Sequence, residues 1–160
     1  MSDQALREHL AWILSGENAH LKFERAIAGL PQKLRGARPQ GTPHSPWRLL
    51  EHLRIAQWDI LEFSRSADHV SPDFPDGYWP EGDAPSDEAT WDHSVAAFQS
   101  DLTAFQGLVT DPANDLFTPF PWGDGQNLLR EALLIADHNA YHLGQLVMVR
   151  RVLGAWDEDG

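Results

Sequence analysis

The segment from about Asn127 to Leu153 constrains the fold more than any other part of the chain. Apolar residues recur along it at steps of three and four, which is the period of an α-helix. They fill two neighbouring stripes, so the apolar arc of this helix is wide. A helix that is apolar over so wide an arc packs near the centre of a bundle. The segment therefore predicts a helical bundle built around its own last long helix.

Three earlier segments also have the pattern of amphipathic helices, at about residues 3–30, 45–67 and 86–111. Gly16 interrupts the first and marks a bend or a close packing contact. Ser45 and Pro46 suit the N-cap and first helical position of the second, and Ser86 suits the cap of the third. We therefore expect four helices, the first of them running from about Asp3 to Leu30.

The connecting segments are long, proline-containing and without strand alternation, at residues 31–44, 68–85 and 111–126. Such lengths are unusual between adjacent antiparallel helices, so at least one connection is expected to cross the end of the bundle. Aromatic residues within them predict ordered loops, and Trp47, Trp79 and Trp122 are candidates to line a pocket for an apolar substrate. The chain shows no internal repeat and no domain break. The prediction is an all-α fold, a four-helix bundle that forms a single domain over residues 1–160.

Charge and cysteine content exclude several classes of function. The chain of 160 residues has 24 acidic and 12 basic residues, for a formal net charge of −12. This balance argues against nucleic acid and anionic membrane surfaces as partners. The absence of cysteine excludes disulfides, thiolate metal sites and a cysteine nucleophile. The polar start and the lack of a long apolar run predict no secretory signal and no membrane span, and hence a cytoplasmic protein.

Three histidines on the predicted inward faces form a candidate metal site. His138 and His142 stand four residues apart, which places both imidazoles on one face of a helix. His52 lies on the inward seam of its own helix. Three neutral imidazoles would leave ligand positions open, which is the pattern of a catalytic metal site. The competing interpretation is that these are core histidines with ordinary hydrogen-bond partners.

Other metal and catalytic patterns fit less well. A di-iron carboxylate bundle needs two Glu-x-x-His pairs, and only Glu17 to His20 has that spacing. A zinc protease motif needs a glutamate between the paired histidines, where this chain has none. His20 could still reach the site as a supporting group, a fourth ligand or a proton carrier. Gln145 lies on the same stripe as the paired histidines and could hydrogen-bond one of them. The remaining histidines are expected at the surface or in loops, namely His9, His44, His69 and His93.

Two stretches of the chain resemble the DinB-like superfamily, which includes proteins described as YfiT-type metal-dependent hydrolases. The first stretch is residues 49–59, Leu-Leu-Glu-His-Leu followed by Ala-Gln-Trp-Asp, and the second and more specific is residues 129–145. The family pattern is one histidine on the second helix and a His-x-x-x-His on the last long helix. His52, His138 and His142 occupy these positions without departure.

The resemblance implies a four-helix bundle of up-down-down-up topology with a long crossover loop, and a homodimer. It also implies a divalent transition metal, zinc or nickel being most frequent, with a small molecule as substrate. The reaction would be a hydrolysis, or a transfer that uses a low-molecular-weight thiol as cofactor. The alternative is a non-catalytic bundle that is stabilised by metal or binds a ligand, with a role in stress. The sequence identifies neither the substrate nor a general acid or base.

Overall fold

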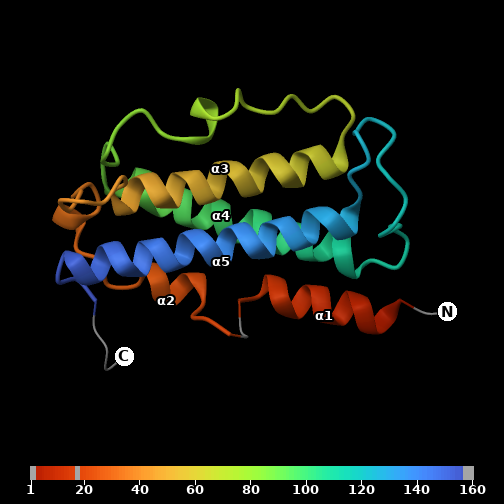
Figure 1. The fold of residues 1–160 in the computed structure, drawn as a ribbon, viewed down its shortest axis with the longest axis horizontal. Helices are drawn as coiled ribbons and strands as arrows, with labels where there is room; N and C mark the ends of the chain where they lie inside the picture. The colour runs from red at the N-terminus through yellow and green to blue at the C-terminus, as the bar shows by residue number, and fades with distance from the viewer. Residues whose placement is uncertain (1–2, 17–18, 157–160) are drawn as a thin grey trace.

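The computed structural model describes residues 3–16 and 19–156, and within these ranges the chain is helical with no strand (Figure 1). The α-helices are α1 (Gln4–Leu14), α2 (Phe23–Ile27), α3 (Pro46–Arg65), α4 (Glu88–Thr110) and α5 (Leu128–Val152). Two short 3-10 helices are η1 (Gln32–Leu34) and η2 (Asp76–Tyr78). The predicted all-α class is confirmed.

The three long helices begin at side-chain caps. The hydroxyl of Ser45 accepts a hydrogen bond from the backbone N–H of Arg48, and Pro46 occupies the first turn of α3. Asn127 caps α5 in the same way. The cap of α4 is Asp87, whose Oδ1 accepts from the N–H of Thr90, so the prediction of Ser86 was wrong by one residue.

The predicted first helix, from about Asp3 to Leu30, is wrong as a single element. It is divided into α1 and α2, and the described residues between them, 15–16 and 19–22, are not helical. Gly16 has a φ of +72°, in the left-handed region that glycine adopts without a steric penalty. A helix ends at such a residue. The apolar period continues into α2 because both pieces pack on the bundle, α1 on the apolar cluster that contains Phe105 and α2 on the one that contains Phe98.

Helix α3 packs against both α4 and α5, and α1 packs against the same two helices from the other side. In Figure 1, α3 and α4 run in the same direction, whereas α1 and α5 run in the opposite one. The segment that joins α3 to α4 returns along the outside of α3 and contains η2. Two apolar clusters form the core, one around Phe98, Leu50 and Leu146 and one around Phe105 and Ile135. None of the described helices is long and apolar enough to cross a membrane.

Candidate metal centre

The structure brings the three predicted histidines together where α3 meets α5. The Nε2 atom of His52 lies 3.1 Å from Nε2 of His142 and 3.0 Å from Nε2 of His138. The potential ligand atoms of the three residues all lie within 4.8 Å of one another. Two nitrogen donors bound to one transition ion at about 2.1 Å, roughly at right angles, are about 3 Å apart. These two spacings therefore suit His52 and each of the other two histidines as donors to a common centre.

Hydrogen bonds at the opposite ring nitrogens determine which atoms can act as ligands. Nδ1 of His52 lies 2.9 Å from the backbone carbonyl oxygen of Tyr78, and Nδ1 of His142 lies 2.8 Å from Oε1 of Gln145. Both partners accept hydrogen bonds, so each Nδ1 carries a proton and donates it. In the neutral rings Nε2 is then unprotonated on both residues. Two lone pairs face each other across 3.1 Å, an arrangement that a bound cation would stabilise.

Aromatic side chains pack against two of the three rings. The indole of Trp79 is stacked on the His52 imidazole, with ring centroids 3.8 Å apart and an interplanar angle of 1°. His44 stacks on the other face of the same indole at 4.0 Å. Tyr141 meets the His142 ring edge-on. His52 and His142 are buried, with 9% and 8% of their surface exposed. The site is thus mostly desolvated, and the crossover segment contributes the aromatic ring that covers His52.

The crossover segment is attached to α3 by a second polar cluster. Asp59 lies two turns beyond His52 on the same face of α3 and is buried. One of its oxygens accepts a hydrogen bond from the hydroxyl of Tyr78 at 2.7 Å, and the other lies 2.7 Å from Nε2 of His69. Tyr78 therefore contacts α3 twice, with its hydroxyl at Asp59 and its carbonyl at His52. This attachment holds both the Nδ1 acceptor and Trp79 against the His52 ring.

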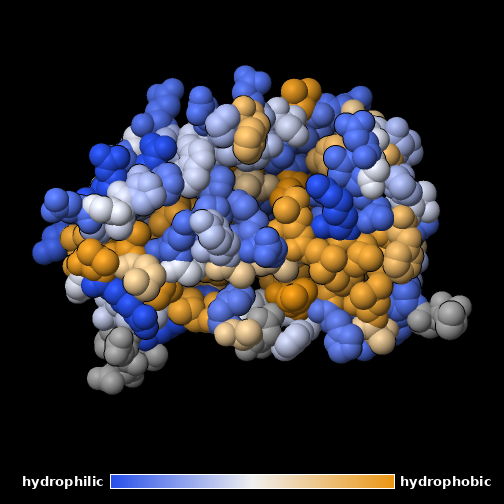
Figure 2. All heavy atoms as spheres, in the orientation of Figure 1, coloured by the Kyte–Doolittle hydropathy of each residue, from blue (hydrophilic) through white to orange (hydrophobic). Residues whose placement is uncertain are grey.

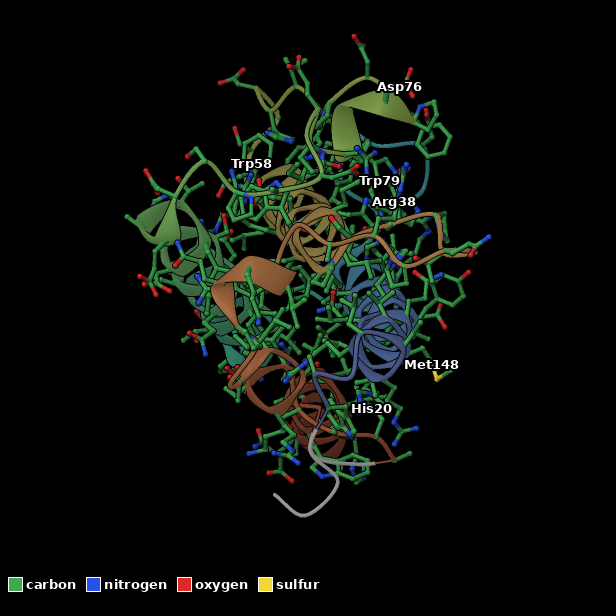
Figure 3. The ribbon with its side chains drawn as sticks, turned by 90° about the vertical axis from the view of Figure 1, so that its left-hand side faces the viewer. His20, Arg38, Trp58, Asp76, Trp79 and Met148 are labelled. Atoms are coloured by element: carbon green, nitrogen blue, oxygen red, sulfur yellow. The ribbon has the colours of Figure 1, made fainter. Side chains whose placement is uncertain are left out.

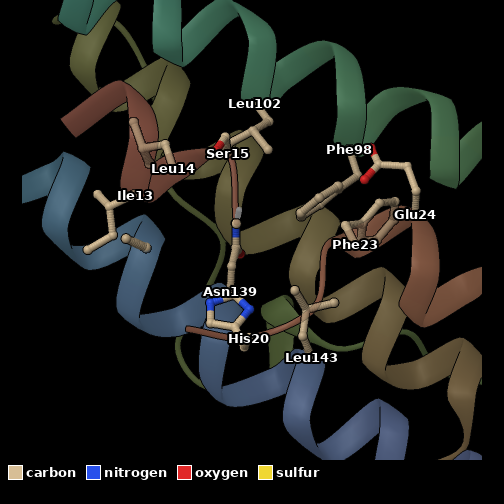
Figure 4. Close-up of a pocket in the computed structure, with 12 residues that line it drawn as sticks. Ile13, Leu14, Ser15, His20, Phe23, Glu24, Phe98, Leu102, Asn139 and Leu143 are labelled. Carbon is tan, nitrogen blue, oxygen red and sulfur yellow. The ribbon is translucent and has the colours of Figure 1, made fainter. Parts of the chain in front are cut away.

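His20 does not join the three histidines. It is exposed, its Nδ1 lies 2.9 Å from the carbonyl oxygen of Leu21, and Figure 3 shows it across α5 from Trp79. It lines instead a small cavity of about 40 Å³ next to Asn139 (Figure 4). The amide of Asn139 donates to Oε1 of Gln57, and its own Oδ1 has no hydrogen-bond partner. A cavity of this size accommodates a water molecule. Its lining includes none of the three histidines, so it is separate from the metal centre. The spacing partner of His20, Glu17, lies outside the described residues.

Sequence reasoning identified Gln145 as a partner of a ligand imidazole, and the structure shows that contact. It assigned no role to Asp59, and it placed His44 and His69 only at the surface or in loops. The position of Asp59 seven residues after His52 was the available signal, since that spacing returns to the same helix face. Tyr78 contributes its backbone carbonyl to the orientation of His52, and no sequence pattern predicts a contact of that kind.

A family model described as the DinB superfamily matches residues 7–146 of the chain. The chain belongs to the DinB superfamily. The match includes all three histidines of the centre. No curated protein and no solved structure matches the chain.

Burial and mutual proximity keep the histidines of this DinB-superfamily site neutral. Desolvation and, to a smaller extent, the neighbouring His142 and His52 rings together lower the pKa of His138 to about 3. Desolvation, together with His52, lowers the pKa of His142 to about 4. Burial also lowers the pKa of His52, and the Tyr78 carbonyl opposes this effect. Neutral imidazoles are the form in which histidine binds metals, so the environment favours the ligand state.

These shifts predict that the metal-free protein loses stability in acid. The unfolded chain takes up protons on these histidines near pH 6.5, whereas the folded chain resists them until the pH approaches 4 or 3. The free energy of unfolding therefore falls as the pH drops below about 6.5, by about 1.4 kcal/mol per pH unit for each proton of difference. Urea unfolding of chelator-treated protein between pH 7.5 and 5 measures this. A His138→Leu variant should show a shallower slope, and an unchanged slope would contradict the assignment.

The attachment of Tyr78 predicts a second effect. Tyr78→Phe removes the hydroxyl bond to Asp59 and loosens the carbonyl that orients His52, so metal affinity should fall by about 10-fold or more. Cobalt titration followed by visible absorption gives the Kd. Tyr141→Phe is the matched control because it alters an exposed tyrosine on α5 and leaves the rings in contact. Equal affinities in Tyr78→Phe and wild type would show that the crossover segment does not orient the ligand.

Proposed function

We propose that this DinB-superfamily protein is a metal-dependent enzyme in which His52, His138 and His142 hold a divalent transition metal. One observation carries the proposal: the Nε2 atoms of His52 and His142 converge at 3.1 Å while each Nδ1 is engaged by an acceptor. Two unprotonated nitrogens that face each other across 3.1 Å in a desolvated site repel, and a cation between the rings would remove that repulsion. The third imidazole, from His138, completes a set of donors on one side of the centre.

Zinc and nickel are among the ions that an imidazole donor set suits, and we propose them here. When bound, such an ion would lower the pKa of a coordinated water or hold the thiolate of a low-molecular-weight thiol. The chain's own residues have distinct tasks around it. The Tyr78 carbonyl and Gln145 fix the orientation of two rings, and Trp79 covers the His52 ring and excludes water from that face. We infer a hydrolase or a thiol-dependent transferase that acts on a small molecule.

The decisive experiment is elemental analysis of untagged protein purified without chelator, with His142→Ala prepared in parallel. Near-stoichiometric zinc, nickel or a related metal in wild type and its loss in the variant would support the centre. Esters, amides and thiol conjugates are then the substrates to screen. No metal in either sample, and no uptake on titration, would refute the proposal. Bound metal without turnover of any of these classes would favour the alternative, a bundle that metal merely stabilises.

The arrangement of the helices supports the expected bundle topology. α1 and α5 run one way while α3 and α4 run the other, which corresponds to up-down-down-up (Figure 1). In this interpretation α1 and α2 together take the place of the first helix, and the segment from Ser66 to Asp87 is the crossover. We propose that this four-helix bundle is a single domain and that it places the metal centre between its second and fourth helices.

We also propose a homodimer, with an apolar patch on α1 and α5 as the interface. Figure 2 shows hydrophobic side chains gathered over the first half of α5 and the neighbouring α1. The exposed members are Trp12, Ile13, Leu133 and Leu134. Large exposed apolar patches mark interaction sites. Leu133→Glu should convert a dimer into a monomer in sedimentation velocity, with His93→Glu on α4 as the surface control. A monomeric wild type would overturn this assignment.

A further inference from the structure

A second pocket lies one side chain away from the metal centre, between the loop at residues 41–44 and the last turns of α5. Its volume is about 200 Å³, and it is lined mainly by apolar side chains, among them Leu49, Met148, Val149 and Val152. Met148 points outward from α5 at its rim (Figure 3). An apolar cavity of about 150 Å³ can bind benzene. The pocket therefore has room for one aromatic ring or a branched aliphatic group of similar size.

Two of the pocket's walls are also supports of the metal centre. Gln145 lines the pocket and accepts the hydrogen bond from Nδ1 of His142. His44 lines it from the loop side and stacks on Trp79, which in turn stacks on His52. The Gln145 side chain therefore lies between the pocket and the His142 ring. On the loop side, the stacked rings of His44 and Trp79 lie between the pocket and the His52 ring.

The lining also restricts the charge of an occupant. No lysine, arginine, aspartate or glutamate is among the residues that form this pocket, in a protein with 24 acidic and 12 basic residues. A charged group would lose hydration there without gaining an ionic partner. The pocket therefore selects an uncharged group, and its apolar walls contribute affinity in proportion to the area that the group buries.

We propose that this pocket binds the uncharged aromatic or branched aliphatic part of the substrate whose reacting group lies at the metal centre. This inference rests on the proposed function and deepens it. Among the possible substrates of a metal-dependent hydrolase or transferase, the pocket selects those with an apolar group of about six to eight heavy atoms. This size follows from its volume, because a cavity of about 150 Å³ accommodates benzene. The 41–44 loop and the end of α5 are then specificity-determining elements.

The first test uses benzyl alcohol as the probe on metal-free, isotope-labelled protein. Benzyl alcohol should shift the backbone amide signals of Gly41 and Thr42 saturably, with a Kd on the order of 1 mM for a fragment of this size. Benzoate, which has the same ring and a negative charge, should not. Met148→Trp should abolish the shifts because the new ring occupies the mouth of the pocket. Val152→Trp provides a second block at an exposed position, and Ala96→Trp on α4 is the matched control that should bind as wild type does.

The second test asks whether the pocket belongs to the metal centre. In cobalt-loaded protein, the ring protons of bound benzyl alcohol should relax faster than in the zinc-loaded protein. Binding at Gly41 and Thr42 without this enhancement would overturn the inference and leave an unrelated ligand site. Shifts that Met148→Trp does not alter, or equal binding of benzoate, would overturn it as well. If the protein takes up no metal but the pocket still binds the probe, the proposed function fails first and the assignment of the pocket as its substrate site fails with it.

Discussion

Zinc should raise the melting temperature of the chelator-treated protein by about 10 °C. A ligand that binds only the folded state adds about 4 kcal/mol at a free concentration 1,000 times its Kd. In a chain of this size each kcal/mol moves Tm by roughly 2–4 °C. The unfolded chain cannot hold His52, His138 and His142 together, since they come from helices far apart in the sequence. Differential scanning fluorimetry over a series of zinc concentrations measures the effect.

His142→Ala should lose most of this rise, because two donors remain where three converged. The comparison is the change on adding zinc within each variant, since removing a buried imidazole alters the starting Tm as well. His93→Ala is the control, because His93 is an exposed histidine on α4. It should respond to zinc as wild type does. An equal rise in His142→Ala and wild type would place the metal elsewhere, and no rise in either would remove the metal centre.

The ligand histidines could be predicted because helix periodicity carries the necessary information. His138 and His142 lie one turn apart, and His52 lies on the seam of a helix expected to pack nearby, so convergence needed only correct helix packing. The groups that orient them are of a different kind. A backbone carbonyl at Tyr78 and an indole at Trp79 depend on the path of a proline-containing crossover segment, which has no repeating pattern. Only the folded chain places that segment over His52.

The same distinction explains the outcome for the helices. The later three helices begin within about two residues of their predicted starts. The first helix was predicted as a single helix because the apolar period continues across Gly16. The left-handed φ of Gly16 changes the direction of the backbone at a single residue. The spacing of apolar residues carries no information about that change. His20 lies after this break, in the segment between α1 and α2, and lines the small cavity beside Asn139.

A buried arginine on α1 is the structural feature that sequence analysis missed most completely. Arg7 is 4% exposed, and its guanidinium donates to the backbone carbonyls of Val109, Asp111 and Asn114 at 2.7–2.9 Å. It also pairs with Asp3. These carbonyls lie at the end of α4 and in the turn after it, where a helix leaves acceptors without partners. Arg7 thus joins α1 to the end of α4.

Arg7→Met should lower the free energy of unfolding by about 3 kcal/mol or more. Methionine fills part of the same volume but leaves three carbonyls without their donor, and removing one partner of a buried charged group typically costs 3–5 kcal/mol. Urea unfolding followed by circular dichroism measures the change. Arg38→Met is the matched control, because that side chain is 54% exposed and its nearest carboxylate, on Asp83, is 4.0 Å away. It should change stability by less than about 0.5 kcal/mol. If Arg7→Met fell within about 1 kcal/mol of wild type, water would be replacing the guanidinium at those carbonyls, and α1 would depend on its apolar face alone.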